Sequence, residues 1–223
     1  MLHRLLCAAF LAAFLVARGS AQAQEVVTPV RYTQLWLDAE VKGKVAKRTT
    51  AIGGLGYRTG DEFGSGRQTY LNGDLRYKVN KYLDLGFEQR AVFRSIGPNR
   101  HRTGLMLLVG ERFGRTTVEY RLNYQHVWRP QGTRRDFIRN KFGAEYDIPK
   151  FQFDPTASVE FFTVLRDTGA EADAVRYKVG STWSPAKGHR FAFALVHDRE
   201  QNRRRPDYRW IFAFGYRLDL GKV

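Results

Sequence analysis

The chain is poor in cysteine, in long apolar runs and in acidic residues relative to basic ones. Its one cysteine is Cys7, so no internal disulfide can stabilise the fold, and burial or closure of a sheet has to do so. The longest apolar run, residues 5–16, is shorter than the ~20 residues that a membrane-spanning helix needs. No helical repeat follows this run, which argues against a helical solenoid.

The N-terminal residues have the layout of a secretory signal peptide. Arg4 precedes the apolar run, and Ala21-Gln22-Ala23 follows it. We expect cleavage after Ala23, which leaves residues 24–223 as one domain; a retained anchor is the alternative. Cys7 lies inside the apolar run rather than after it, which argues against a lipoprotein.

Basic residues exceed acidic ones, 37 to 22, giving a formal net charge of +15. Arg4 and Arg18, in the expected signal peptide, contribute only two of these charges. A basic protein often binds nucleic acid, but export argues against that partner. In a bacterial envelope the available polyanions are lipopolysaccharide and acidic sugars.

Two-residue alternation of apolar and polar side chains recurs along the rest of the chain, with turn residues between the segments. Most segments have about ten residues or more, against ~9–11 for strands that cross a bilayer. The alternation predicts strands at Gln34–Lys42, Thr49–Arg58, Gln68–Val79, Leu83–Arg94, Arg102–Arg112, Thr117–Trp128, Phe137–Ile148, Thr156–Leu165, Val175–Trp183, Arg190–Asp198 and Tyr208–Leu220.

The connections between these segments alternate between short ones and longer, more polar ones such as Gly60–Arg67, Arg129–Arg135 and Arg166–Asp173. Short periplasmic turns that alternate with longer external loops are typical of an outer-membrane barrel. We therefore predict an all-β, antiparallel, up-and-down transmembrane β-barrel in the outer membrane of a Gram-negative bacterium. A soluble β-sandwich is the alternative.

The two faces of each segment differ in chemistry. In Thr117–Trp128, Val118, Tyr120 and Leu122 share one face, whereas Glu119 and Arg121 lie on the other. An outward Arg or Lys at mid-depth in a bilayer costs ~2–4 kcal/mol, so the charged face is expected to line the lumen.

The predicted lumen has more basic than acidic side chains. These cations either form cross-lumen ion pairs that brace the interior or provide a positive path for an anionic solute. The lumen-lining binding candidates are Arg58, Arg76, Arg90, Arg102, Arg121, Arg139, Lys141, Arg176, Lys178, Arg209 and Arg217.

The number of strands presents a parity problem. Bacterial single-chain barrels have even strand numbers, whereas the alternation gives eleven segments, the first and last running in the same direction. Residues Glu25 to Tyr32 are therefore expected to carry the chain outward first, as a twelfth strand or by threading the lumen. We expect twelve strands, with ten as the alternative.

Few residues suggest catalysis. A lipid hydrolase would need a Ser with a His near the outer rim, and the candidates are His101 or His126 with Ser95, and His189 or His197 with Ser181. No nucleophile motif surrounds any of them, so we predict no catalytic residue, no metal site and no cofactor.

Three arginines in one loop, Arg203, Arg204 and Arg205, are candidates for contact with lipopolysaccharide phosphates.

The chain resembles the outer-membrane barrels grouped as domain-of-unknown-function family 2490. The motifs that carry the resemblance are Leu35-Trp36-Leu37, Asn80-Lys81-Tyr82-Leu83, Arg100-His101-Arg102, Tyr120-Arg121-Leu122-Asn123-Tyr124, Ile138-Arg139-Asn140-Lys141 and Lys187-Gly188-His189. The resemblance implies an outer-membrane barrel and no established activity.

Together these features predict a small passive channel or binding barrel for anionic solutes. A structural or surface-interaction barrel without conductance is the alternative, and a lipid hydrolase a minor one. The expected partners are outer-membrane lipid, lipopolysaccharide, the barrel-assembly machinery and small anions. The sequence does not indicate an oligomeric state.

Overall fold

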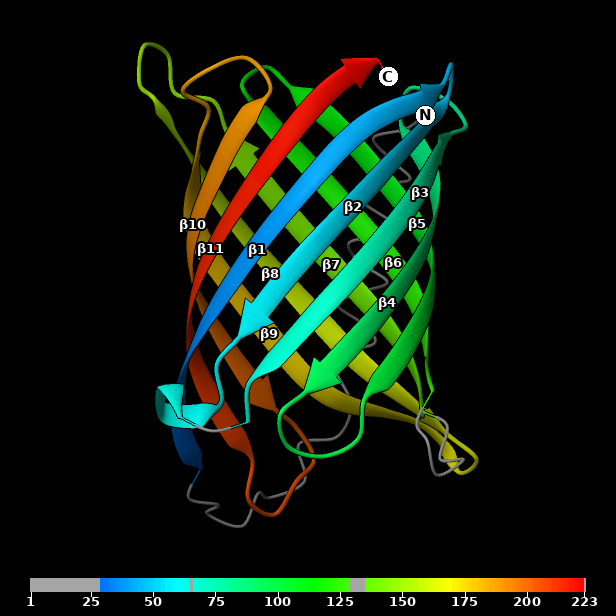
Figure 1. The fold of residues 1–223 in the computed structure, drawn as a ribbon, viewed down its shortest axis with the longest axis vertical. Helices are drawn as coiled ribbons and strands as arrows, with labels where there is room; N and C mark the ends of the chain where they lie inside the picture. Colours follow the sequence, from blue (N-terminus) through cyan, green and yellow to red (C-terminus); the bar gives the residue numbers. More distant parts are fainter. Residues whose placement is uncertain (1–28, 65, 129–134, 223) are drawn as a thin grey trace.

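The computed structural model describes residues 29–64, 66–128 and 135–222, and these form a closed barrel of eleven strands (Figure 1). A one-turn 3-10 helix, η1 (Asp61–Phe63), lies in the connection after the second strand. The strands are β1 (Val30–Ala46), β2 (Thr49–Arg58), β3 (Gln68–Lys78), β4 (Leu83–Arg94), β5 (Arg100–Phe113), β6 (Thr116–Trp128), β7 (Arg135–Tyr146), β8 (Phe153–Arg166), β9 (Gly169–Trp183), β10 (His189–Glu200) and β11 (Asp207–Lys222).

The described residues contain no helix with the length and apolarity needed to span a membrane.

Side-chain alternation separates an apolar outer wall from a polar interior, as the sequence predicts. On β3 the outward Leu71 and Leu75 are each about half exposed, whereas the inward Tyr70 is buried. A small apolar core lies inside the barrel and includes Met106 and Val164. The prediction of an all-β barrel is confirmed. Large exposed apolar side chains on nearly every strand make the outer wall a surface that water solvates poorly.

The barrel closes through a parallel pair of strands, β1 and β11, in a register that runs from Val30 opposite Asp207 to Lys42 opposite Asp219. All other neighbouring pairs are antiparallel. The expected count of twelve, or ten, is therefore off by one. Residues Val30–Tyr32, expected in a twelfth strand or in a segment that threads the lumen, belong to β1 itself. Residues 25–28 and the expected signal peptide lie outside the described residues. Parallel pairing of the first and last strands resolves the parity problem.

The two ends of the barrel differ (Figure 1). We call the end with connections 47–48, 79–82, 114–115, 147–152 and 184–188 the turn end, and the end with connections 59–67, 95–99, 129–134, 167–168 and 201–206 the loop end. The predicted long loop Arg166–Asp173 is wrong, because β8 and β9 pair up to Arg166 opposite Gly169. Gly169 permits this tight hairpin with a φ of 128°.

Close packing of β9 on β10 depends on Gly180. A Cβ added there would lie 2.2 Å from the carbonyl oxygen of Phe193 and 2.9 Å from the Cα of Ala194. These neighbours are backbone atoms that belong to the ladder itself, so they cannot move aside as a flexible side chain could.

Gly180→Ala is expected to lower the free energy of unfolding by about 1–3 kcal/mol, because the strands must separate to admit the methyl group. The measurement is the urea midpoint of the refolded barrel in detergent. Gly53→Ala is the matched control, since a Cβ there meets no atom within 4 Å. Equal midpoints for the two variants would contradict the prediction.

Candidate functional site

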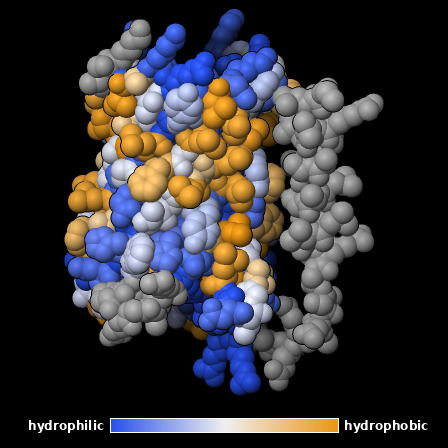
Figure 2. Space-filling view, turned by 90° about the vertical axis from the view of Figure 1, so that its right-hand side faces the viewer, coloured by the Kyte–Doolittle hydropathy of each residue, from blue (hydrophilic) through white to orange (hydrophobic). Residues whose placement is uncertain are grey.

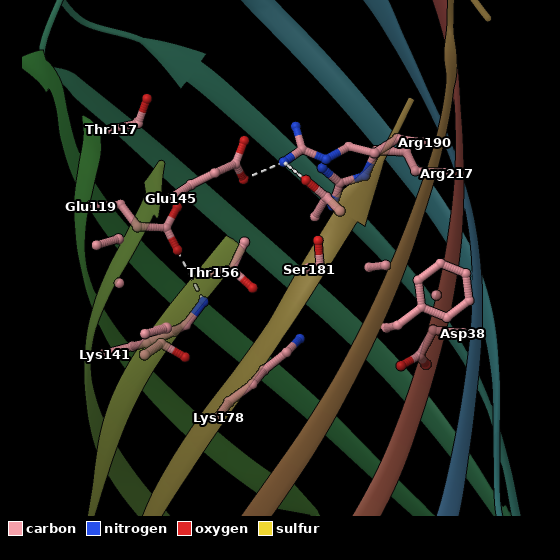
Figure 3. Close-up of a pocket in the computed structure, with 18 of the residues that line it drawn as sticks. Asp38, Thr117, Glu119, Lys141, Glu145, Thr156, Lys178, Ser181, Arg190 and Arg217 are labelled. Carbon is pink, nitrogen blue, oxygen red and sulfur yellow. Dashed lines mark hydrogen bonds and ion pairs between the residues drawn. The ribbon is translucent and has the colours of Figure 1, made fainter. Parts of the chain in front are cut away.

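The lumen contains two cavities that meet near the middle of the barrel. The turn-end cavity has a volume of about 540 Å³ and the loop-end cavity about 530 Å³. Both are lined by Asp38, Glu40, Lys141, Ser158 and Lys178, which we call the waist. Figure 3 shows side chains from several strands converging on the turn-end cavity. The volumes are in the range of sites for small ligands, ~300–1,000 Å³.

A buried carboxylate, Glu160 on β8, organises the loop-end cavity. Its Oε1 accepts hydrogen bonds from Arg121 Nη2 at 3.0 Å and from Arg139 Nε at 3.1 Å. Arg176 Nη1 lies 3.8 Å from Oε2 and its Nη2 is 2.7 Å from Asp198. These five residues, the Glu160 cluster, join β6 to β10. Several cations around one carboxylate offset the cost of removing its charge from water.

A second buried carboxylate, Glu88 on β4, has a similar environment. Arg102 Nε donates a hydrogen bond to Glu88 Oε1 at 2.9 Å, and Arg90 Nε lies 4.0 Å from the same oxygen. Glu88 and Glu160 are each only 5% exposed. Removal of either carboxylate would therefore leave arginines close together without compensation.

Arginines and aromatic rings alternate across the lumen wall between these two carboxylates. Each guanidinium carbon lies 4.0–5.0 Å from the centroid of the neighbouring ring, which is a favourable cation–π distance. The order of this arginine–aromatic ladder is Arg90, Tyr70, Arg58, Trp36, Arg176, Phe162 and Arg139. The phenol of Tyr70 also donates a hydrogen bond to Asp38.

A ring of ion pairs lies at the loop-end mouth. Arg209 contacts Asp61 at 3.5 Å and Glu200 at 3.7 Å and also pairs with Asp207. Asp61 belongs to η1, and its Oδ1 accepts a hydrogen bond from Gln34 at 2.6 Å. The connection 59–67 is thereby held against β1 and β11 at the mouth.

The charge balance differs between the cavities. Among the described residues, the turn-end cavity is lined by four basic and four acidic side chains, whereas the loop-end cavity has ten basic and seven acidic ones. The loop-end cavity therefore has a net positive lining.

Two of its cations, Arg58 and Lys178, have no ion pair with any described acidic residue. Arg58 instead contacts two aromatic rings, with its guanidinium carbon 4.0 Å from the ring centroid of Trp36 and 5.0 Å from that of Tyr70. Figure 3 shows Lys178 extending into the lumen without a bonded partner, whereas Lys141 is bonded to Glu119.

Ten of the eleven predicted lumen-lining residues line a cavity. Arg217 lines the turn-end cavity and pairs with Glu40 at 2.7 Å, and the remaining nine line the loop-end cavity. Arg76 lines neither and contacts Asp74 at 3.4 Å.

Arg203 contacts Asp173 and Glu200 at the mouth, and Arg204 and Arg205 are exposed. A binding role for any of them stays a prediction.

The predicted His–Ser pairs are not brought together among the described residues. Ser95 lies in the connection 95–99, and His101 faces outward on β5 next to Trp128. His189 contacts the hydroxyl of Tyr216 at 2.9 Å, and His197 stacks on Trp210. His126 instead contacts Asp136. The described residues also contain no group of three or more His, Cys, Asp or Glu placed to hold a metal ion.

Sequence reasoning missed Trp36 and Tyr70, which hold Arg58. The predicted lumen-lining candidates are all basic, because they were chosen for their charge, and none of them is aromatic. The available signal was alternation: Trp36 is two residues from Asp38, and Tyr70 is two residues from Asn72, so each lies on the polar face of its strand.

The fold and the site define a closed β-barrel with a charged, ion-paired interior. The chain belongs to the family described as "Protein of unknown function (DUF2490)", whose model matches residues 33–209. The resemblance seen in the sequence is thereby confirmed. Neither a search of curated proteins nor one of solved structures found a match.

Glu160→Gln is expected to lower the free energy of unfolding by about 3 kcal/mol or more, because three arginines lose their shared counter-charge while staying buried. Glu171→Gln is the matched control, since its ion pair with Arg166 is solvent-exposed and worth less than about 1 kcal/mol. Urea unfolding of both variants tests this. A similar loss in both would contradict the prediction.

Proposed function

We propose that this protein is an outer-membrane barrel that binds small anionic solutes in its lumen and passes them slowly across the membrane. The net positive lining of the loop-end cavity is the observation that carries the proposal. The unpaired Arg58 and Lys178 add to it, because an anion entering the cavity meets two cations that need not first leave an acidic partner.

The apolar outer wall supports a membrane location. Leu71, Leu105 and Val179 are each more than half exposed, which is costly in water but not in hydrocarbon. The signal-like N-terminus supports export. The turn end then faces the periplasm and the loop end the exterior, where Arg204 and Arg205 are exposed to lipopolysaccharide phosphates. The barrel-assembly machinery is the expected route of insertion, and the proposal includes no nucleic-acid partner and no cofactor.

The cross-lumen contacts support binding with slow passage rather than a wide aqueous pore. The arginine–aromatic ladder and the Glu160 cluster both lie between the mouth and the waist. A solute of about monosaccharide size fits a cavity of about 530 Å³, but it has to pass Arg176 and Lys178 to reach the turn end.

Refolded protein in planar bilayers is expected to give small conductances with a reversal potential that favours anions under a KCl gradient. The positive lining is the reason, since it lowers the free energy of an anion in the lumen. Cation preference would overturn the proposal, and so would silence in recordings where a known porin inserts normally.

A second candidate is a structural barrel without conductance, which the Glu160 cluster favours. Ion pairs that join β6 to β10 brace the lumen whether or not a solute enters. This candidate predicts silence in the same recordings, together with a loss of stability when Arg121 or Arg139 is truncated.

Lys178→Gln is expected to shift the reversal potential towards zero, because it removes an unpaired positive charge from the waist. Lys42→Gln is the matched control: it makes the same chemical change in a residue already neutralised by Asp219 at 3.0 Å. Bi-ionic reversal potentials measure the effect. A shift from Lys42→Gln as large as that from Lys178→Gln would contradict the assignment.

A further inference from the structure

The five connections at the turn end form a basic rim. Asp147, the one acidic residue in these connections, pairs with Arg112 at 2.6 Å. Figure 2 shows hydrophilic side chains projecting from this end, at the top of the view, above apolar side chains of the outer wall. Each connection contains at least one exposed cation that has no ion pair with a described acidic residue, namely Lys47, Arg48, Lys81, Arg115, Lys150 and Lys187.

The loop end has a more even balance of charge. Its described connections contain three acidic residues, Asp61, Glu62 and Asp167, and Arg203 pairs with two further carboxylates at the mouth. The basic excess is therefore larger at the turn end, and this end suits an anionic partner.

Five aromatic rings form a continuous belt on the outer wall beside the basic rim. Phe151, Phe153, Trp183, Phe191 and Tyr216 follow one another from the connection before β8 to β11, with successive ring centroids 5.0–6.0 Å apart. The arginines adjacent in sequence to Phe191 and Tyr216 line the turn-end cavity, so strand alternation turns these two rings outward. Aromatic belts lie at the level of the lipid headgroups in membrane proteins.

A groove in the outer wall begins at this aromatic belt and crosses the parallel β1–β11 pair. The strands that form it, β10, β11, β1 and β2, lie side by side at the front of Figure 1. The groove has a volume of about 290 Å³, and its lining is almost wholly apolar and includes Phe191 and Tyr216. Its floor is Ala39, which lies opposite Tyr216 on one side and Leu55 on the other. One methyl group between two large side chains leaves the depression.

Polar atoms lie at the turn-end edge of this groove. The hydroxyl of Tyr216 is 2.9 Å from Nδ1 of His189, the first residue of β10. Lys187 precedes His189 by two residues in the connection 184–188. An apolar groove, a polar pair and an exposed cation thus follow one another towards the turn end. The acyl chain, the ester group and the phosphate of a phospholipid follow one another in the same order.

We propose that the groove binds one acyl chain of an anionic phospholipid, with the phosphate of that lipid against Lys187 and Lys150 at the basic rim. Burial against the apolar lining stabilises the chain, and Lys and Arg at a membrane surface attract anionic headgroups. The inference rests on the membrane location proposed above, with the turn end at the periplasmic leaflet, but not on anion passage.

A second copy of this chain is disfavoured as the occupant of the groove. A symmetric contact of two barrels through the β1–β11 pair would bring two basic rims together, because the same surface serves both partners. Like charges placed opposite each other suppress such a contact. An anionic headgroup instead complements the charge of the rim.

The experiment measures which lipid remains bound to the full mature barrel after insertion into vesicles of phosphatidylglycerol and phosphatidylethanolamine in equal amounts with the same acyl chains. Native mass spectrometry after extraction into a nonionic detergent identifies the lipid. We expect one retained phosphatidylglycerol, preferred about tenfold, because two cations face its phosphate. Equal retention of both lipids would overturn the site alone. Failure to insert, judged by flotation, would overturn the membrane location as well.

A second arm includes lipopolysaccharide in the same vesicles. Phosphatidylglycerol is expected to remain the bound lipid, because the groove opens towards the turn end and not towards the loop end. Replacement of the retained phosphatidylglycerol by lipopolysaccharide would overturn the assignment to a phospholipid.

Ala39→Leu tests the groove by filling its floor with an outward side chain. We expect retention of phosphatidylglycerol to fall about tenfold, which corresponds to roughly two methylene groups of the chain left without contact. Ala91→Leu is the matched control, because Ala91 is an outward alanine on β4, opposite Leu71 and His101. Urea midpoints like that of the parent barrel show that both variants fold. Unchanged retention in Ala39→Leu, or an equal loss in both, would overturn the groove.

A double variant, Lys150→Gln with Lys187→Gln, tests the basic rim. It is expected to abolish the preference for phosphatidylglycerol and to leave retention of phosphatidylethanolamine unchanged, because only the charge is removed. Lys78→Gln with Lys81→Gln is the matched control, since both lysines are exposed at the same end but belong to the β3–β4 hairpin. A loss of preference as large in the control would overturn the placement of the phosphate.

Discussion

Burial of carboxylates among arginines is the constraint on which the interior depends. The inward face of the strands is largely polar. Apolar side chains alone therefore cannot fill the interior of this eleven-stranded barrel. Glu88 pairs with Arg102 on β5 and with Arg90 on its own strand, and Glu160 pairs with arginines on β6, β7 and β9. The ion pairs thus join the strands across the interior, as a hydrophobic core does in other proteins. Burial removes these charges from water, and only several partners for each carboxylate offset that cost. Arg58 and Lys178 have no ion-paired acidic residue among the described ones, and the proposed binding of anions depends on these two cations.

The arginine–aromatic ladder gives this interior its stiffness. A guanidinium that packs against aromatic rings is restricted in orientation by its flat shape, and that of Arg58 lies 4.0 Å from the ring centroid of Trp36 and 5.0 Å from that of Tyr70. Arg58 is held in this way by Trp36 and Tyr70. A preorganised cation binds an anion without losing much further side-chain freedom.

Alternation along the sequence was enough to predict the barrel, the segments that became strands and the inward direction of most basic residues. The prediction from the sequence departs from the structure in three places. The parity argument assumed antiparallel closure, whereas β1 and β11 pair in parallel. The polar stretch 166–173 was taken as a loop although its backbone continues the β8–β9 ladder. Trp36 and Tyr70 were missed because the lumen candidates were chosen for their charge, although alternation places both rings on the inward face. The His126–Asp136 contact joins two strands across a connection, and only the register brings these residues opposite each other.

The parallel β1–β11 pair sets the order in which the chain can fold. Glu40 and Arg217, which contact across this pair, are 177 positions apart in sequence. Contacts of such separation form only after a large loss of chain entropy, so they come late in folding. The ten antiparallel pairs are local hairpins that can assemble in sequence, but they leave an open, curved sheet with two unsatisfied edges. Until β11 reaches β1, that sheet exposes a long row of unpaired backbone groups, and whatever assists assembly has to protect this edge.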